Sequence, residues 1–152
     1  MIAIDAGTTG VRSRAVFTDE RPASGSYREF TQHFPQPGWV EHDADEIWAA
    51  ARDTLNHVVA DVGIDTVAAI GITNQRETVL AWNRSTGVPY GNAIVWQDRR
   101  TAQRCDELVA AGHLGLVRER TGLVLDPYFS GTKVEWLLAN RDIRIDDDLA
   151  IG

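Results

Sequence analysis

The N-terminus of the chain predicts two strands joined by a short turn. Residues 2–4 are apolar and are followed at once by the small and polar residues of a turn, residues 5–10. Beyond the turn, apolar or small side chains occupy every second position of residues 11–17, a period that indicates a strand and not a helix. The chain therefore enters a sheet from its first residues.

The next segments predict a third strand, a helix and a buried strand. Residues 27–34 are expected to form the strand. Asp43 and Glu46 resemble the capping box that starts a helix, and apolar residues at helical spacing predict an amphipathic helix over 44–62. Residues 67–72 form an uninterrupted apolar run, which is typical of a strand buried on both faces.

The second half of the chain predicts shorter strands and more helices. Residues 79–82 and 93–96 are expected to pair around a long loop, a helix is expected over about 99–112, and another follows Ser130. Residues 141–152 resemble the interruption of a longer sequence, so we expect an incomplete domain. The order of these elements predicts an α/β fold with a sheet of mixed direction.

Composition narrows the class of protein. The net charge of −7, without a basic block, argues against a wide nucleic-acid-binding face. Cys105 is the single cysteine, so an internal disulfide is excluded, which fits a reducing compartment. The sequence has no apolar run near the ~20 residues that span a bilayer, and its start lacks the pattern of a signal peptide. We therefore expect a cytoplasmic protein that binds neither nucleic acid nor membrane.

The turn at residues 5–10, DAGTTG, has the chemistry of a phosphate-binding loop. Gly7 and Gly10 let the backbone turn tightly and approach a ligand. Thr8 and Thr9 offer amides and hydroxyls to phosphate oxygens. The loop is not a Walker A motif, because it has no GK[ST] ending and a strand follows it. An ordinary hairpin turn explains the same residues about equally well.

Two charged residues flank this loop. Asp5 ends the first expected strand and could hold Mg²⁺ directly or through water. Arg12 lies just past the turn, where its guanidinium could meet a phosphate.

A second candidate site follows the apolar run 67–72. Arg76 and Glu77 lie beyond its carboxyl end, where open α/β sheets bind ligands, and together they could bind a small polyol. Trp96 and Tyr128 could provide apolar walls and a phenol hydroxyl. A solvated ion pair and ordinary core packing are the plainer explanations of these two pairs.

Other chemistry-bearing residues are expected to be structural. Core packing is expected of four tryptophans, Trp39, Trp48, Trp82 and Trp136. Residues 98–100, Asp-Arg-Arg, are expected to be a charge cluster at a helix start, and the four histidines show no metal-ligand spacing.

Three longer stretches carry a specific match to a known family. They are residues 28–43, REFTQHFPQPGWVEHD; residues 70–101, which contain NQRET and IVWQ; and residues 118–133, which contain DPYFSGTK. On these motifs the chain resembles the glycerol kinases of the FGGY sugar-kinase group. The resemblance implies an actin-like, ribonuclease-H-like fold, in which two lobes close on ATP and substrate.

The resemblance also implies roles for both candidate sites. In the loop, Asp5 would help hold Mg²⁺, and the nucleotide or the transferred phosphate would contact four residues, Thr8, Thr9, Gly10 and Arg12. Glycerol hydroxyls would be held by Arg76, Glu77 and Tyr128, with Trp96 packed against the substrate. The implied reaction is ATP-dependent phosphorylation of glycerol to sn-glycerol 3-phosphate, by an enzyme that is a homo-oligomer at full length.

The chain departs from the family in its loop and its length. The family loop usually reads DQGTTSSR, whereas Ala6, Gly10 and Val11 stand here in place of Gln and two Ser. Gly10 therefore lacks one possible phosphate-binding hydroxyl but keeps its amide. Family members are much longer, and their general-base aspartate and second lobe come later in the sequence. Residues 1–152 are expected to be part of the N-terminal kinase domain, without the second lobe.

Two alternatives remain open at this point. One is a kinase of the same group that acts on another small polyol or sugar. The other is a non-catalytic polyol-binding or assembly module.

Overall fold

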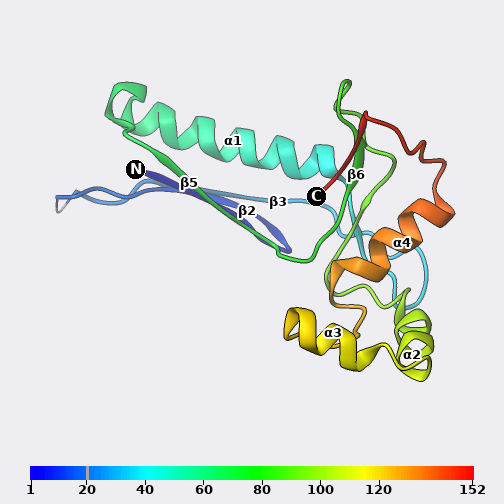
Figure 1. Ribbon diagram of the computed structural model, residues 1–152. Coiled ribbons are helices and arrows are strands. Elements are labelled where there is room, and N and C mark those ends of the chain that lie inside the picture. The colour runs from blue at the N-terminus through cyan, green and yellow to red at the C-terminus, as the bar shows by residue number, and fades with distance from the viewer. Residues whose placement is uncertain (20) are drawn as a thin grey trace. The chain divides into compact units, whose positions relative to one another are not determined.

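The computed structural model describes residues 1–19 and 21–152. The chain forms two compact units, and Figure 1 labels most of their helices and strands. Unit 1 comprises Met1–Gln32 and Asp43–Gln75, and unit 2 comprises His33–His42 and Arg76–Gly152. In the described parts of the chain, no helix is both long and apolar enough to cross a membrane.

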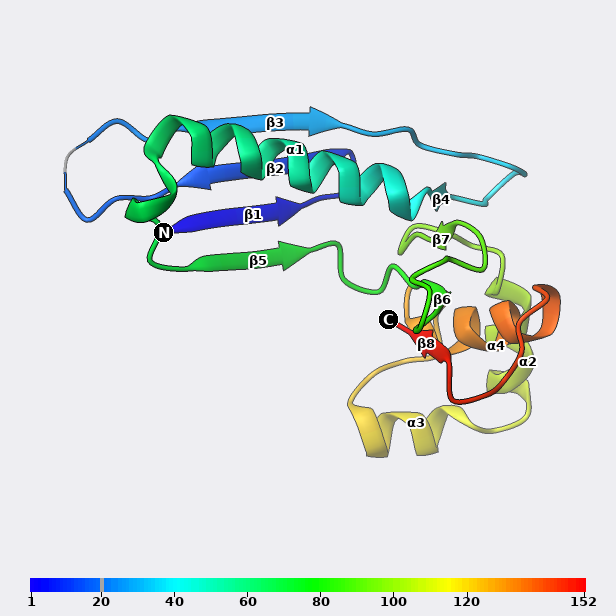
Figure 2. The same ribbon diagram turned by 90° about the horizontal axis from the view of Figure 1, so that it is seen from above.

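Unit 1 is built on a four-stranded mixed sheet, as the sequence predicts. Its strands are β1 (Ile2–Ala6), β2 (Gly10–Ala15), β3 (Gly25–Glu29) and β5 (Ile70–Asn74). They lie in the order β3-β2-β1-β5, with antiparallel pairs except for the parallel pair of β1 and β5 (Figure 2). The turn between β1 and β2 is the candidate phosphate loop.

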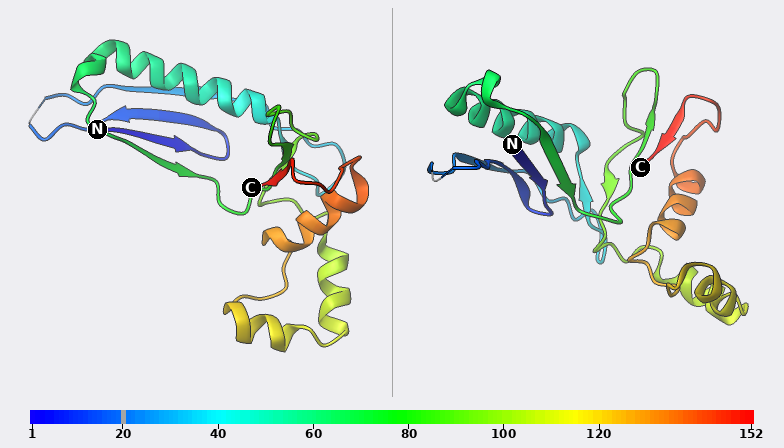
Figure 3. Two further views of the ribbon diagram at one scale, coloured as in Figure 1. Left: turned by 45° about the horizontal axis from the view of Figure 1, so that its top comes forward. Right: turned by 60° about the vertical axis from the view of Figure 1, so that its left-hand side comes forward.

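One helix, α1 (Ala44–Val62), covers one face of this sheet and matches its expected bounds (Figure 3). The Asp43 carboxylate accepts hydrogen bonds from the backbone amides of Asp45 and Glu46, at 2.8 and 3.3 Å, and so caps the helix. A 3₁₀ turn, η1 (Ile64–Thr66), follows. The core between helix and sheet contains seven buried residues, Ile2, Ile4, Val11, Ala15, Phe30, Ala50 and Val58.

Three expectations about unit 1 are wrong. The third strand ends at Glu29 and not at residue 34. Every residue of β5 is exposed, Ile72 to 75%, because β5 is an edge strand beyond the part of the sheet that α1 covers. Trp48 is 65% exposed and is not a core residue. In the last two cases an apolar side chain is present, but no neighbouring element covers it.

Unit 2 contains two small antiparallel sheets. One pairs β4 (Glu41–His42) with β7 (Ala93–Ile94), and the other pairs β6 (Ala81–Asn83) with β8 (Leu149–Ile151). The expected pairing of residues 79–82 with 93–96 is reduced to one isolated bridge, between Val79 and Ile94. Residues 141–152, which were expected to be an interruption, include strand β8. Its three residues are too few to show a strand periodicity in the sequence.

Three helices complete unit 2: α2 (Ala102–Ala110), α3 (Leu114–Thr121) and α4 (Ser130–Asn140). Helix α4 begins where the sequence predicts, whereas α2 begins three residues late and α3 is not predicted. Leu137 of α4 packs into an apolar cluster with Val79, Ala81 and Ile94, against which Trp136 also lies.

Candidate functional site

The candidate phosphate loop of unit 1 is a tight turn anchored from two sides. Within the turn, the Gly7 amide donates a hydrogen bond to the Gly10 carbonyl at 3.0 Å. Gln32 Nε2 donates to the Thr8 carbonyl at 3.0 Å, and Gln75 Nε2 donates to the Gly7 carbonyl at 3.4 Å. Side chains that follow β3 and β5 therefore hold the loop, whose tip residues Thr8 and Thr9 keep partly accessible surfaces.

Asp5 and Arg12 lie opposite each other beside this loop. They are register partners in the β1–β2 ladder, and both side chains are exposed. The Asp5 carboxylate lies toward the loop, since its Oδ1 is 4.0 Å from the position that a Cβ on Gly7 would take. An anionic and a cationic group thus flank the turn in the way that a metal-bound phosphate requires.

The surroundings of Asp5 suit Mg²⁺ that arrives with a phosphate ligand. Among the described residues, no group of three or more His, Cys, Asp or Glu could hold a metal ion. Mg²⁺ usually keeps several waters and is bound by one or two carboxylates together with substrate phosphates. One accessible carboxylate beside a phosphate loop fits that pattern.

A tyrosine that the sequence did not single out completes this side of unit 1. Tyr27 of β3 is the register partner of Arg12, whose guanidinium carbon lies 5.3 Å from the centroid of the Tyr27 ring. The Tyr27 and Thr9 hydroxyls are 3.3 Å apart and share a hydrogen bond. The pairing register of β2 and β3 places Tyr27 beside Arg12. The sequence alone does not determine this register, so Tyr27 could not be predicted.

In unit 2, Glu77 is fixed by the start of helix α4. Its carboxylate oxygen Oε2 accepts hydrogen bonds from the amide and the hydroxyl of Ser130, at 2.9 and 2.8 Å. The carboxylate therefore satisfies a donor at a helix N-terminus, where negative charge is favoured. Glu77 is half-buried and has a φ of 64°, a rare conformation for a residue other than glycine. It is not the solvated ion pair that was the plainer expectation.

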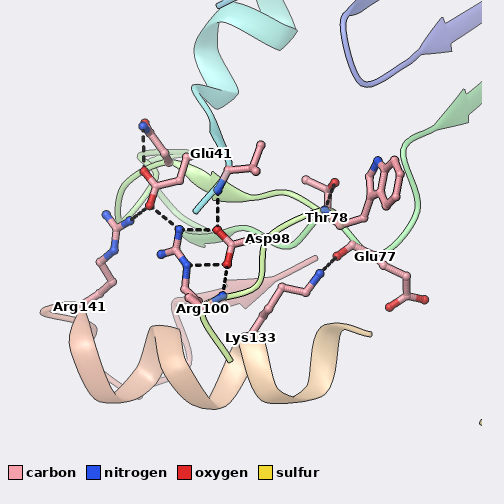
Figure 4. Close-up of polar contacts among 10 residues, drawn as sticks. Glu41, Glu77, Thr78, Asp98, Arg100, Lys133 and Arg141 are labelled. Carbon is pink, nitrogen blue, oxygen red and sulfur yellow. Dashed lines mark hydrogen bonds and ion pairs between the residues drawn. The ribbon is translucent and has the colours of Figure 1, made fainter. Parts of the chain in front are cut away.

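Lys133 joins the Glu77 and Tyr128 segments. It is the only lysine in the sequence and is fully buried. Its Nζ donates hydrogen bonds to the backbone carbonyls of Glu77 and Tyr128, at 2.6 and 2.9 Å; Figure 4 shows the first. Burial lowers the pKa of Lys133 to about 8, against the opposing influence of the Glu77 and Asp98 carboxylates. The lysine lies one helical turn before Leu137, so its inward position could have been read from the sequence.

Trp96 and Tyr128 meet beside this junction. Their ring centroids are 5.9 Å apart at an interplanar angle of 68°, and Tyr128 is 36% exposed. The Trp96 amide donates to the hydroxyl of Thr78, the residue after Glu77, at 3.2 Å. The structure thus brings Glu77, Trp96 and Tyr128 into one local group. Arg76 precedes Glu77 and its side chain is exposed.

Two residues of the expected helix-start cluster, Asp98 and Arg100, belong instead to a buried ion network, which corrects the prediction, whereas Arg99 is exposed. The Arg100 guanidinium donates to both oxygens of Asp98, at 3.0 and 2.8 Å, and to Glu41 at 2.8 Å (Figure 4). Its guanidinium carbon also lies 3.8 and 4.4 Å from the ring centroids of Trp39 and Trp136. These buried charges are therefore paired within the interior of unit 2.

A hollow of about 500 Å³ in unit 2 has a different character. It lies along α2, α3 and α4, and its lining includes Leu108, Val117, Leu123 and Phe129. Arg104 and Glu135 also line the hollow but bind each other at 2.9 Å, and the apolar side chains do not offer the hydroxyl-binding groups that a polyol needs. We therefore assign no polyol binding to this hollow.

The two candidate groups belong to different units. The loop residues Asp5, Thr8, Thr9, Gly10 and Arg12 lie in unit 1, and the polyol group Arg76, Glu77, Trp96 and Tyr128 lies in unit 2. Each group has a defined geometry within its own unit.

The comparisons with known proteins agree on one family. The model of the FGGY family of carbohydrate kinases, N-terminal domain, matches residues 1–146. A glycerol kinase of Haemophilus influenzae is 58% identical over 144 residues, and one of Rhizobium rhizogenes is 54% identical over 142 residues. Each match covers 92% of this chain, and the chain spans only 28% of either relative.

Solved structures share the fold. A Plasmodium falciparum glycerol kinase with ADP matches 99% of this chain and 31% of its own, with a TM-score of 0.90 and 33% identity. A xylulose kinase from Rhodospirillum rubrum matches 91% of this chain and 29% of its own, with a TM-score of 0.81. At 24% identity, the second match shows the fold alone.

Proposed function

Since the chain belongs to the FGGY family of carbohydrate kinases, we propose that it provides the phosphate loop and the polyol-binding residues of an ATP-dependent glycerol kinase. The reaction would convert glycerol and ATP to sn-glycerol 3-phosphate and ADP. The observation that carries the proposal is the identity of 54–58% to curated relatives that are named glycerol kinases. Their matched region includes both candidate groups.

The loop of unit 1 would bind the transferred phosphate. The hydroxyls of Thr8 and Thr9 and the amide of Gly10 would donate to phosphate oxygens, and Arg12 would balance their charge. Asp5 would hold Mg²⁺, which supplies charge neutralisation at the phosphates when bound. Support comes from the match to a glycerol kinase structure that contains ADP.

The group in unit 2 would bind glycerol. The Arg76 guanidinium would donate to hydroxyl oxygens, and the Glu77 carboxylate would accept from hydroxyl protons. Because Ser130 occupies oxygen Oε2 of Glu77, we assign glycerol to the other oxygen, Oε1. Tyr128 would add a phenol hydroxyl, and Trp96 would cover the carbon side of the polyol.

A replacement experiment tests the proposal. In the Haemophilus influenzae glycerol kinase, the matching segment is replaced by this chain, and the resulting chimera is called the joined protein. The original Haemophilus influenzae enzyme is the control. We expect the joined protein to phosphorylate glycerol with ATP in preference to xylulose and other small polyols. Higher turnover on one of those substrates would favour another sugar specificity. A folded but inactive joined protein, beside an active control, would contradict the proposed function.

A further inference from the structure

Tyr27 lies against the phosphate loop although it is far from the loop in sequence. The ladder between β2 and β3 pairs Arg12 with Tyr27 and Gly10 with Glu29. This register brings the Tyr27 hydroxyl within 3.3 Å of Thr9 Oγ1 and places the ring under the Arg12 guanidinium. Tyr27 is 45% exposed, so a ligand at the loop can reach it.

Gly10 and Tyr27 fit each other sterically. A Cβ on Gly10 would lie 2.6 Å from the Tyr27 hydroxyl and 2.6 Å from the Arg28 carbonyl oxygen, closer than real Cβ atoms approach. No side chain at position 10 therefore fits between the Tyr27 ring and the Arg28 backbone. The Tyr27 hydroxyl itself occupies the region into which a side chain at position 10 would project.

We propose that Tyr27 is a phosphate-contacting residue of this loop and supplies the hydroxyl that Gly10 lacks. The proposal rests on the function proposed above. The Thr9 and Tyr27 hydroxyls carry two protons, of which one lies in their shared hydrogen bond. The other proton is free to point at a phosphate oxygen, and Arg12 beside the same ring supplies the positive charge.

The pairing explains why the loop can hold a glycine at a position where a hydroxyl is useful. The Tyr27 hydroxyl would provide this donor from the neighbouring strand β3.

Magnesium ADP binding tests the proposal without glycerol. The chain is titrated with magnesium ADP while the amide NMR signals of Thr9 and Gly10 are followed, and the KM for ATP is measured in the joined protein. Tyr27→Phe keeps the ring and its packing and removes only the hydroxyl. We expect about tenfold weaker binding and a similarly raised KM for ATP, the scale of a hydrogen bond to a charged group, with an unchanged KM for glycerol.

A second variant separates a phosphate contact from a packing role. Tyr27→Phe keeps the ring beside Arg12, whereas Tyr27→Ala removes the ring and the hydroxyl together. A phosphate contact predicts that Tyr27→Phe already loses most of the affinity that Tyr27→Ala loses. A packing role predicts that only Tyr27→Ala weakens binding.

The outcomes distinguish this inference from the proposed function. If Tyr27→Phe binds magnesium ADP within twofold of the parent while Tyr27→Ala does not, the role of Tyr27 is overturned while glycerol kinase activity stands. If the parent binds no magnesium ADP, the inference falls together with the phosphate-loop assignment. Glycerol specificity in the joined protein is read independently of both.

Discussion

The two candidate groups are held in different ways. The loop in unit 1 has a bond within its own turn, between Gly7 and Gly10, and is also anchored by the side chains of Gln32 and Gln75. Its charged neighbours Asp5 and Arg12 are exposed and belong to no such anchor. The group in unit 2 depends on distant partners, since Glu77 is bonded to Ser130 and Lys133, more than fifty positions later. Changes in the loop should therefore alter ligand binding with little effect on folding, whereas changes in the polyol group should alter both.

The largest effect is expected from Asp5→Asn in the joined protein. Removing the charge proposed to hold Mg²⁺ should lower Mg²⁺-dependent turnover by about a hundredfold or more, since metal charge stabilisation contributes several kcal/mol. Because Asp5 is exposed, the melting temperature should stay almost unchanged. Steady-state assays at varied Mg²⁺ and calorimetry provide the two readings. A large fall in the melting temperature would show that the loop is not independent of folding.

Lys133 should give the free energy of unfolding a dependence on pH. Its folded pKa of about 8 lies below the ordinary 10.5, so between these values the unfolded chain binds more protons than the folded chain. Stability should therefore rise from pH 8 to 10.5 by about 3 kcal/mol, and Lys133→Met should lose this rise. Urea denaturation of both proteins at several pH values measures the difference.

A direct reading of the same group is available because the chain has no other lysine. In protein labelled with ¹³C-lysine, one side-chain signal should titrate near pH 8. A midpoint at the ordinary value of 10.5 would mean that Lys133 does not join the two segments in the buried position described.

Two variants of Glu77 should separate its effect on glycerol binding from its effect on capping of helix α4. Glu77→Gln keeps an oxygen that can accept from Ser130 and removes the charge, so glycerol affinity should fall by about 1.5–3 kcal/mol with little loss of stability. Glu77→Ala should lose the cap as well, at an additional cost in stability of about 1 kcal/mol. Glycerol KM and denaturation curves measure these effects. If Glu77→Gln leaves the KM within twofold, Glu77 is a structural cap only.

Gln32→Ala is expected to have the smallest effect. It removes the hydrogen bond from Nε2 to the Thr8 carbonyl and should cost about 1 kcal/mol of stability. Hydrogen exchange at the loop amides should accelerate, while the polyol group is unaffected. A loss comparable to that of Lys133→Met would weaken the contrast between a local loop and a long-range polyol group.

The same contrast explains what the sequence could predict. Helix α1 and its Asp43 cap, the turn between β1 and β2 and the start of α4 all depend on residues a few positions apart, and all are found where expected. The exposure of the edge strand β5 could not be predicted, because an apolar run alone does not show whether another helix or strand covers it.

Long-range pairing accounts for the remaining misses. The network of Asp98, Arg100 and Glu41 joins residues almost sixty positions apart, so its charges resemble a helix start when read locally. Strand β8 is three residues long and exists through its pairing with β6. The role of Tyr27 depends in the same way on the register of β2 and β3.

The most direct test of the central claim is an NMR titration of the chain with each ligand in turn. Glycerol, added into the millimolar range, should shift the Trp96 indole and the amides of Glu77 and Ser130 and leave the loop signals in place. Magnesium ADP should shift the amides of Thr8, Thr9 and Gly10 and leave Trp96 in place. Glycerol shifts that are absent at Trp96 and Glu77, or that fall on the phosphate loop instead, would contradict the assignment of a separate polyol group and phosphate loop.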